Sequence, residues 1–582
     1  MSELLEPAQA APNAAAPLDA QRPWLRSYPA GVPAEIDAGA YPSLVALLGE
    51  SFRRFADRDA AICLGQRMSF AALDRHSQHL AAWLQAQGLS RGDRVAVMMP
   101  NLLQYMVAIA GILRAGMVVV NVNPLYTARE LEHQLKDSGA KAIIVLENFA
   151  HTLAEVIDET PVQHVVLASV GDMLPWWKGQ LVNFLLRHLK GAVPEYKLPT
   201  GPERRVLRFN AMLEEGACLH WREPSLTGDD VAFLQYTGGT TGVSKGATLL
   251  HRNVVANILQ SDAWFQPMLK RLEPGKQVVI VCALPLYHIF ALTACYMLGT
   301  RLGFLNILIP NPRDLGSVVE ALRGHRINVF PAVNTLFNAL ANDARFRQLD
   351  FSELVISNGG GMAVQQATAE RWLQVTGCPV VEGYGLSETS PVATINPLDL
   401  RAFNGSIGLP VPSTEISIRD DAGRPVPTGE RGEICIRGPQ VMAGYWQRPD
   451  ETALVMDADG FFKSGDIGIM DAAGYVRIVD RKKDMILVSG FNVYPTEIEQ
   501  VVNLHPGVLE CAAIGVPDAR SGEAVKLYVV RDDPTLDESD LQRHCAQQLT
   551  AYKCPKYIEF RDELPKSNVG KILRRELRSP GA

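Results

Sequence analysis

The chain has 582 residues, of which 47% are hydrophobic and 20% charged, with 47 Gly and 37 Pro. At about 100–200 residues per domain, this length excludes a single small domain and predicts three or more folding units, and the ordinary hydrophobic fraction excludes wholesale disorder. The 56 Lys and Arg against 63 Asp and Glu give a net charge of −7, which disfavours a protein whose main partner is nucleic acid.

Cysteine content and the N-terminal composition bear on the compartment. The chain has nine Cys, an odd number, and no two of them form a C-x-x-C pair or a cluster with zinc-ligand spacing. Such thiols are typical of a reducing compartment, so we expect a cytoplasmic protein. Residues 1–35 begin with an Ala/Pro-rich stretch that lacks a secretory signal, and we expect a flexible tail with ordered structure starting near Trp24 or later.

Short apolar runs alternate with longer helix-like stretches through most of the chain. The run VAVMMP at 95–100, for example, precedes the apolar-rich NLLQYMVAIAGILRAG, after which VVVNVNP is typical of the next strand. This strand–helix–strand order predicts parallel sheets covered by helices, so the predicted fold class is α/β, with two parallel-sheet subdomains in a large N-terminal body. The same order recurs at 278–284, 307–310, 327–332 and 353–357.

The sequence pattern changes in the last third of the chain. After about residue 404, alternating residues and turn signals predict a small antiparallel, β-rich subdomain. From Asp480 the charged stretch DRKKD leads into a last α+β segment, which predicts a linker and a separate, mobile domain. The predicted units are the tail at 1–35, the N-terminal body at 36–480, a hinge linker at 481–484 and the C-terminal domain at 485–582.

One apolar stretch imitates a membrane span. Val278–Gly299 contains no Asp, Glu, Lys or Arg and is long enough to cross a bilayer. Pro285 and His288 lie at its centre, however, where a lone span would have to bury both in lipid. We therefore expect a buried strand, a loop and a buried helix instead.

The segment Trp176–Lys190 is a candidate for contact with a lipid surface. It begins with two Trp, places Leu181, Leu185 and Leu189 on one helix face, and carries basic residues but no acidic one. A cationic amphipathic helix of this kind suits the surface of an anionic leaflet. The alternative, which the sequence leaves equally open, is a surface helix packed on the body or on a second subunit.

The densest candidate site is the run YTGGTTGVSKGA, directly after the strand-like VAFLQY. Glycines let the backbone close around phosphate oxygens, threonine hydroxyls and backbone N–H groups donate to them, and the lysine supplies positive charge. The run does not match the Walker pattern G-x-x-x-x-G-K-[ST], so a P-loop kinase or motor is disfavoured. The predicted phosphate-binding residues are Tyr236, Thr237, Gly238, Gly239, Thr240, Thr241, Gly242, Val243, Ser244, Lys245, Gly246 and Ala247.

Further motifs, taken with this run, point to one family. They are SNGGGMA at 357–363, EGYGLSET at 382–389, KSGDIG at 463–468, DRKKDMILVSGFNVYP at 480–495 and LPKSNVGKILRR at 564–575. In this order they resemble the adenylate-forming superfamily of acyl-CoA synthetases, nonribosomal-peptide adenylation domains and luciferases. Phrases such as LPLYHIFALT, GLPVPSTE and GPQVMAGYWQRPDET are most similar to the bacterial long-chain fatty acid–CoA ligases.

The resemblance implies a two-step ligation. ATP converts a fatty acid to acyl-AMP with release of pyrophosphate, and the thiol of coenzyme A then attacks this mixed anhydride to give acyl-CoA and AMP. Because the first step brings an anionic carboxylate against an anionic phosphate, Mg²⁺ and a lysine are expected to screen the approach. The resemblance also implies that 36–480 is the AMP-binding domain and 485–582 its associated C-terminal domain, with the active site between them.

Motif positions imply roles within the N-terminal body. Glu388 matches the Mg²⁺ ligand, and Thr237 is a second candidate contact to the metal. Ser387 stands where the family usually has Thr, and its hydroxyl can still donate to phosphate. Tyr384 and Gly359–Gly361 match the adenine pocket, where an aromatic face and close backbone approach suit a flat purine.

The boundary region and the C-terminal domain carry the other implied roles. Asp466 and Arg481 match the ribose-binding pair, in which a carboxylate accepts from both ribose hydroxyls. Lys571 matches the adenylation lysine, and Lys483 matches the hinge about which the C-terminal domain changes orientation between the two steps. Gly490 marks the expected path of the pantetheine thiol.

His288 is expected to line the acyl or acyl-adenylate site, without an assigned acid–base role. The expected partners are fatty acid, ATP and coenzyme A, with a homodimer and peripheral contact with the cytoplasmic face of the inner membrane. Medium-chain or aryl-acid CoA ligation, and transfer of acyl-AMP to a carrier protein, stay open as alternatives. A non-catalytic membrane protein for fatty-acid uptake is a further alternative, against which Lys571, Glu388 and Asp466 count.

Overall fold

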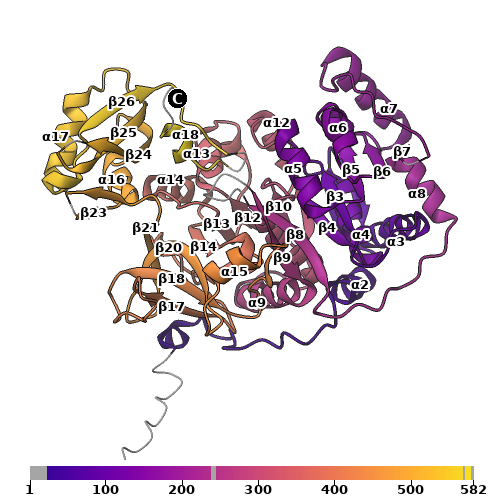
Figure 1. Cartoon of the computed structure of the whole chain (residues 1–582), viewed down its shortest axis with the longest axis horizontal. Coiled ribbons are helices and arrows are strands. Elements are labelled where there is room, and N and C mark those ends of the chain that lie inside the picture. The colour runs from indigo at the N-terminus through magenta and orange to yellow at the C-terminus, as the bar shows by residue number, and fades with distance from the viewer. Residues whose placement is uncertain are drawn as a thin grey trace, which may run out of the picture.

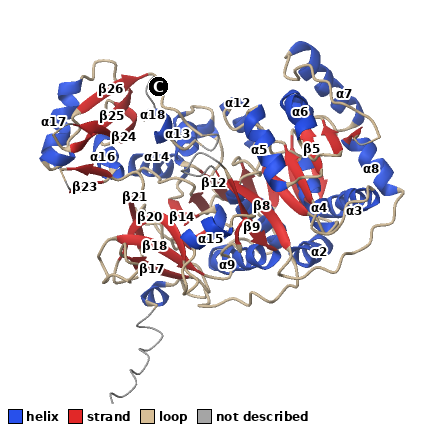
Figure 2. Cartoon of the chain, in the orientation of Figure 1, coloured by secondary structure: helices blue, strands red, loops and turns tan. Residues whose placement is uncertain are grey.

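The protein is described from a computed structural model, which describes residues 22–202, 204–237, 244–489, 491–518, 520–567 and 570–578. Residues 238–243 of the predicted phosphate-binding run and Gly490 therefore lie outside the described residues. Figures 1 and 2 show a large N-terminal body of sheets and helices, a small β-rich unit beneath one end of it, and a C-terminal domain above that unit. The predicted α/β fold class is confirmed.

The first large sheet has eight strands within the described residues, in the spatial order β19 (Gly444–Tyr445), β9 (Lys245–Leu250), β8 (Val231–Thr237), β4 (Val118–Asn121), β3 (Arg94–Met98), β5 (Ala142–Leu146), β6 (His164–Ala168) and β7 (Arg205–Arg208). The pairings from β8 to β7 are parallel, whereas β9 and β19 extend the β8 edge by antiparallel pairing. Both faces are buried, since Val95 and Val97 pack into one core while Ala96 and Met98 pack into another.

Helices cover both faces of this sheet (Figure 1). Every residue of α4 is buried, because α4 packs in the core that the two large sheets share, and this explains its all-round apolar sequence. On the other face, α5 begins at a Thr127 capping box and ends at Gly139, whose φ of 62° favours glycine. The helices before β9 are α2 (Leu44–Arg54), α3 (Phe70–Ala86), α4 (Leu103–Arg114), α5 (Ala128–Ser138), α6 (Ala150–Val156), α7 (Trp176–Phe184) and α8 (Phe209–Ala217).

The second large sheet has nine strands within the described parts of the chain, in the order β16 (Leu409–Pro410), β15 (Val392–Ile395), β14 (Val380–Gly385), β13 (Ile356–Gly359), β12 (Val329–Ala332), β10 (Val279–Cys282), β11 (Leu305–Leu308), β1 (Asp59–Cys63) and β2 (Gln66–Ser69). The pairings from β14 to β1 are parallel, and antiparallel strands close both edges. Its helices are α9 (His251–Leu269), α10 (Ile289–Ala291), η5 (Leu292–Met297), α11 (Leu298–Leu302), α12 (Leu315–Leu322), α13 (Asn334–Asn342) and α14 (Gln366–Thr376).

The apolar stretch Val278–Gly299 does not form a continuous helix. It contains β10, a loop through Pro285 and His288, and then the buried turns of α10, η5 and the start of α11, as predicted. Nowhere in the described ranges is there a helix that is both long and apolar enough to cross a membrane. The strand predicted at 353–357 is displaced toward the C-terminus, because the glycine that ends β13 still pairs with β12.

The predicted β-rich unit is a four-stranded antiparallel sheet, counted over the described residues, in the order β17 (Glu415–Arg419), β18 (Gly432–Arg437), β20 (Phe462–Met470) and β21 (Val476–Arg481). The helix α15 (Pro449–Val455) connects β19 to it. Residues 22–35, placed in the predicted tail, pack against this unit. Trp24 in the turn η1 (Pro23–Ser27) is buried, and the guanidinium of Arg22 lies 3.0 Å from the carboxylate of Glu415.

The C-terminal domain has its own sheet and cores. Its strands, in the described part of the chain, are β23 (Phe491–Val493), β22 (Ile486–Val488), β25 (Gly522–Arg531), β24 (Val508–Asp518) and β26 (Tyr557–Arg561), the last paired in parallel with β25. Its helices are α16 (Pro495–Val502), α17 (Glu538–Gln548) and α18 (Arg574–Leu577). The separate cores on the two faces of this sheet match the α+β domain that the sequence predicts.

Candidate active site

One cavity of about 2130 Å³ lies where both large sheets, the small β-rich unit and the C-terminal domain meet. Several parallel strands end at its wall, since Asn121, Thr237, Gly360 and Gly385 all line it. Open α/β sheets bind ligands outside the carboxyl ends of their strands, where backbone groups and loops are free to contact them. Lys571 enters the same cavity from the C-terminal domain.

The predicted ribose pair is assembled across two strands of the small sheet. Asp466 and Arg481 are direct partners in the β20–β21 register, and Arg481 Nε lies 3.1 Å from Asp466 Oδ1. The Tyr384 hydroxyl donates to Asp466 Oδ2 over 2.6 Å, and burial followed by the Asp466 charge raises the pKa of Tyr384. Each carboxylate oxygen thus has one donor and keeps a lone pair for a hydroxyl of a ligand.

The candidate adenine wall lies beside this pair. Gly360 and Gly361 follow β13 and line the cavity together with Tyr384. Gly361 has a φ of +76°, and a Cβ at Gly360 would lie 3.0 Å from the ring of Phe290, so both positions favour glycine. Sequence reasoning missed the neighbouring Asn358, which also lines the cavity and whose buried Oδ1 has no hydrogen-bond partner among the described residues. An orphaned acceptor at this place fits the amino group of a purine.

The predicted phosphate-binding run is described only at its two ends. Thr237, Ser244 and Lys245 line the wall on either side of the residues outside the description. Lys245 forms an ion pair with Glu451 of α15, and its Nζ lies 5.5 Å from the ring centroid of Tyr445. No sequence motif points to Glu451, because its approach to Lys245 depends on how α15 folds back on β9.

Three predicted residues are not among the described residues of the cavity wall. Ala247 is buried within β9, and Gly246 packs against the ring of Tyr236, where a Cβ would lie 3.1 Å from Cε2. Gly359 lies within β13, where a Cβ would lie 2.5 Å from a valine side chain. Tyr236 does reach the wall, but its hydroxyl donates to Asp137 over 2.7 Å. Gly246, Ala247 and Tyr236 thus shape the strands that flank the predicted phosphate-binding run, and Gly359 shapes β13 in the other sheet.

Glu388 lies in a single turn that follows β14, the 3₁₀ segment η7 (Ser387–Thr389). Its carboxylate is buried and accepts from the Tyr445 hydroxyl over 2.8 Å, and burial raises its pKa. Ser387 and Glu388 both line the cavity. Among the described residues no three His, Cys, Asp or Glu side chains form a metal-binding group. A cation here would therefore need ligand oxygens besides this one carboxylate.

Lys571 and His288 are 283 positions apart in the chain and face the same space. Burial, followed by the charge of Arg481, lowers the pKa of Lys571 to about 7. Burial, followed by the charge of Lys571, lowers the pKa of His288 to about 4, so this imidazole is neutral at pH 7. His288 Nδ1 accepts from the Phe290 N–H over 3.3 Å at the start of α10. An anion that enters the cavity would favour the protonated form of Lys571.

Part of the cavity wall, here called the apolar arm, belongs to the N-terminal body and is mostly apolar. The arm is lined by Ser261 and Phe265 of α9, Ala294 of η5, Leu298 of α11 and Ile395 of β15. None of these side chains carries a charge, and most are buried. A long alkyl chain is the kind of group that such a wall accommodates.

The predicted hinge residue Lys483 lines the cavity between the two domains, and burial lowers its pKa. Its neighbours belong to different sides. Arg481 ends β21 of the small sheet, whereas Asp484 forms ion pairs with Arg574 and Arg578 of the C-terminal domain at 3.3 and 3.2 Å. Lys482 and Lys483 are thus the two residues between the last residue of a strand of the body and Asp484, which is anchored to the C-terminal domain.

The surface helix α7 is amphipathic, but its apolar face points to the solvent and its polar face packs on the body. Its buried residues are Gly179 and Asn183, and Asn183 Oδ1 accepts from the Gly171 N–H over 2.8 Å. Its outer face carries the large apolar side chains, with Trp176 80% exposed and Trp177 65%. The helix lies at the end of the molecule opposite the C-terminal domain (Figure 1).

Comparison with known proteins agrees with this geometry. The AMP-binding enzyme family matches residues 48–446, and the AMP-binding enzyme C-terminal domain family matches residues 497–571. The chain is 56% identical to a long-chain-fatty-acid–CoA ligase of Escherichia coli O6:H1 over 95% of this chain and 97% of that protein. It is 55% identical to the ligase of the same name from Yersinia pestis over 96% of this chain and 98% of that protein.

A solved structure has the same architecture. The crystal structure of ATP-bound MatB from Rhodopseudomonas palustris superposes with a TM-score of 0.76 at 29% identity, covering 93% of this chain and 98% of that one. The sequence matches extend over both the N-terminal body and the C-terminal domain, so the likeness includes the residues on both sides of the cavity. The chain belongs to the AMP-binding enzyme family.

Proposed function

We propose that the protein is a long-chain fatty acid–CoA ligase, which activates a fatty acid to acyl-AMP with ATP and transfers the acyl group to coenzyme A. The observation that carries this proposal is the composition of one cavity. Lys571, the Asp466–Arg481 pair and Lys245 line the same cavity as the uncharged residues of the apolar arm. The long-chain-fatty-acid–CoA ligase relatives support the choice of substrate.

The nucleotide occupies the wall between the small sheet and β13. Asp466 accepts from the ribose hydroxyls while Arg481 holds the carboxylate in place. The adenine lies against Tyr384 and the backbone of Gly360–Gly361, and its amino group donates to the orphaned Asn358 Oδ1. This placement satisfies the buried acceptor, which would otherwise carry a desolvation cost.

The phosphates lie toward Thr237, Ser244 and Lys245, and the triphosphate displaces Glu451 from Lys245. Mg²⁺ fits Glu388, because this hard cation is usually held by one or two carboxylates together with substrate phosphates. Bound there, the ion would neutralise charge on the phosphates. Thr237 and Ser387 offer hydroxyls beside it.

The acyl chain lies in the apolar arm, and the direct test is product formation with acids of different length. Thioester and AMP formation in detergent, with no membrane present, is expected to be most efficient with long saturated acids. A preference for medium-chain or aromatic acids would favour the alternative ligases. AMP formation that needs a carrier protein in place of coenzyme A would favour a carrier ligase, and no AMP formation would favour a binding protein.

The ribose assignment predicts the effect of Asp466→Ala. Loss of buried, charge-assisted hydrogen bonds is expected to cost about 2–3 kcal/mol, which is roughly a 30–150-fold rise in the KM for ATP. Both half-reactions are expected to slow, because ribose is held in each. Asp466→Asn, which keeps the shape and one acceptor, is the matched control and is expected to lose less. Unchanged ATP binding by calorimetry for Asp466→Ala would contradict the assignment.

The two domains and the linker between them have separate roles. Residues 36–480 form the catalytic body, 481–484 the linker with its hinge at Lys483, and 485–582 the domain that delivers Lys571 for adenylation. Gly490, outside the described residues, borders the path of the pantetheine thiol. The protein is expected to form a homodimer. Sedimentation of the purified protein at several concentrations tests this expectation.

The outer face of α7 is the proposed contact with the cytoplasmic face of the inner membrane. Lys178 directly follows the exposed Trp pair and Lys190 ends the segment, which contains no acidic residue and so suits anionic headgroups. The helix is held to the body by its small and polar face, so its apolar face stays outward.

Replacing both exposed Trp is expected to weaken this contact. Trp176→Ala with Trp177→Ala should lower sedimentation with anionic vesicles several-fold, while turnover of detergent-dispersed substrate stays within about twofold. Leu504→Ala is a matched control, since Leu504 is 60% exposed in the C-terminal domain. Unchanged sedimentation of the Trp variant would instead assign the face to a protein contact.

A further inference from the structure

Lys571 belongs to a short antiparallel pair, residues 565–567 against residues 570–573, which is here called the hairpin. The Ser567 N–H donates to the Lys571 carbonyl over 2.7 Å, and the Lys571 N–H donates to Ser567 Oγ over 3.1 Å. The Leu573 N–H donates to the Pro565 carbonyl over 2.8 Å, which closes the base. A two-stranded hairpin of this size is marginal by itself, so its position must be set by contacts with other parts of the protein.

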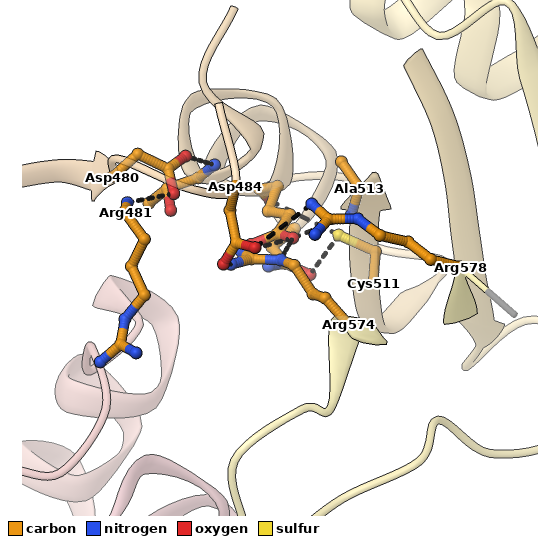
Figure 3. Close-up of polar contacts among 10 residues, drawn as sticks. Asp480, Arg481, Asp484, Cys511, Ala513, Arg574 and Arg578 are labelled. Carbon is orange, nitrogen blue, oxygen red and sulfur yellow. Dashed lines mark hydrogen bonds and ion pairs between the residues drawn. The ribbon is translucent and has the colours of Figure 1, made fainter. Parts of the chain in front are cut away.

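The base of the hairpin is anchored inside the C-terminal domain. Arg574, the residue that opens α18, forms a two-pronged ion pair with Glu499 of α16 at 2.7 Å and a second pair with Asp484 at 3.3 Å. Figure 3 shows Arg574 and Arg578 converging on Asp484, next to the Asp480–Arg481 end of the small sheet. These side chains are largely shielded from water, so the pairs are screened little and fix the base firmly.

The tip of the hairpin is seated on the N-terminal body. Gly570 precedes Lys571, and a Cβ on Gly570 would collide with Thr335 Oγ1. Thr335 lies in the first turn of α13, which follows β12, and β12 pairs directly with β13 at Ala332 and Gly359. Thr335 is therefore connected to β12 and β13, the same pair of strands that ends at the candidate adenine wall.

We propose that Thr335 is a positioning residue for Lys571, because the backbone of Gly570 rests on it and so fixes how far the lysine reaches into the cavity. Thr335 is not among the described residues of the cavity wall, so it acts through the hairpin. The ion pairs of Arg574 hold the base of the hairpin in place, and the contact with Thr335 sets how far the hairpin extends toward the cavity. This proposal rests on the proposed adenylation role of Lys571.

Only glycine fits at the tip for two separable reasons. The φ of Gly570 is +80°, which strains any other residue, and the space for a Cβ is occupied by Thr335. Gly522 in β25 separates the two effects, because it has the same φ of +80° while its nearest Cβ neighbour would be 3.8 Å away. Gly522→Ala thus carries the backbone strain without the collision.

The test compares the two half-reactions in a set of variants. Gly570→Ala is expected to lower fatty-acid-dependent ATP–pyrophosphate exchange by about 10²-fold, the scale of a misplacement of about 1 Å. Thioester formation from supplied acyl-AMP and coenzyme A is expected to stay within about twofold, which also shows that the variant is folded. Gly522→Ala is expected to change neither reaction by more than about twofold.

Second-site variants identify the seat. Thr335→Ala added to Gly570→Ala makes room for the new methyl group and is expected to restore exchange at least about tenfold, whereas Thr335→Val, which keeps the volume, is expected to restore none. Equal restoration by both, no restoration by Thr335→Ala, or equal losses in both half-reactions for Gly570→Ala would overturn the proposal. If Lys571→Ala retains exchange, the proposed adenylation role of Lys571 is wrong. If Lys571→Ala loses exchange but Gly570→Ala does not, only the positioning role of Thr335 is wrong.

Discussion

Lys571→Ala is expected to lower fatty-acid-dependent ATP–pyrophosphate exchange by about 10²–10³-fold, the scale of deleting one preorganised charge-stabilising donor. The half-buried Lys571 lies in the cavity that we propose brings a carboxylate and a phosphate together, where each interaction is stronger than in water. Conversion of supplied acyl-AMP and coenzyme A to thioester is expected to persist, because the lysine serves the first step. Similar losses in both assays by a folded variant would contradict this division.

The lowered pKa of Lys571 provides a second measurement that distinguishes the protein from the Lys571→Ala variant. With a pKa of about 7, the free amine loses its charge as pH rises through neutrality, and the phosphates of ATP favour the protonated form. Binding of ATP between pH 7 and 8 is therefore expected to take up a proton, which calorimetry in buffers of different ionisation enthalpy measures. That uptake is expected to shrink in Lys571→Ala.

Lys483→Pro is expected to show the opposite pattern, keeping pyrophosphate exchange and losing most thioester formation. Lys483 separates Arg481, fixed in β21, from Asp484, fixed by two arginines of the C-terminal domain. A change of domain orientation must be absorbed between these two points, and proline locks φ near −65° and restricts the preceding residue. Within the described residues the Lys483 N–H makes no backbone hydrogen bond that proline would remove.

Lys483→Ala is the matched control for this change, because it removes the side chain while leaving the backbone free to rotate. It is expected to keep both half-reactions within a few-fold. Supplied acyl-AMP isolates the second step in each variant. Full thioester formation by Lys483→Pro would mean that the domain turns about another residue or does not turn.

Motif residues close in sequence to strand ends were accessible to prediction. Asp466 and Arg481 were paired from the motifs in which they occur, and the antiparallel register places them opposite each other. The strand–loop–helix interpretation of Val278–Gly299 followed from a proline and a histidine that lipid would not tolerate. In both cases the information lies within a few residues of the feature that it specifies.

Contacts between distant segments could not be predicted in this way. Glu451 reaches Lys245 only because α15 folds back on β9, and Asn358 is orphaned only because of what packs around it. Thr335 and Gly570 meet across a domain boundary, and each is an unremarkable residue in its own segment. Such pairs depend on the packing of whole units, which the pattern of one chain does not encode locally.

The position of α7, far from the C-terminal domain, has a consequence for how the protein would work on a lipid surface (Figure 1). An adsorbed molecule would be tethered through its N-terminal body, while the C-terminal domain, which we propose reorients during turnover, would stay free in water. Adsorption would then concentrate the protein where fatty acids partition and lower the amount of lipid-borne substrate needed for half-maximal rate. The maximal rate itself would be the same for adsorbed and dissolved molecules.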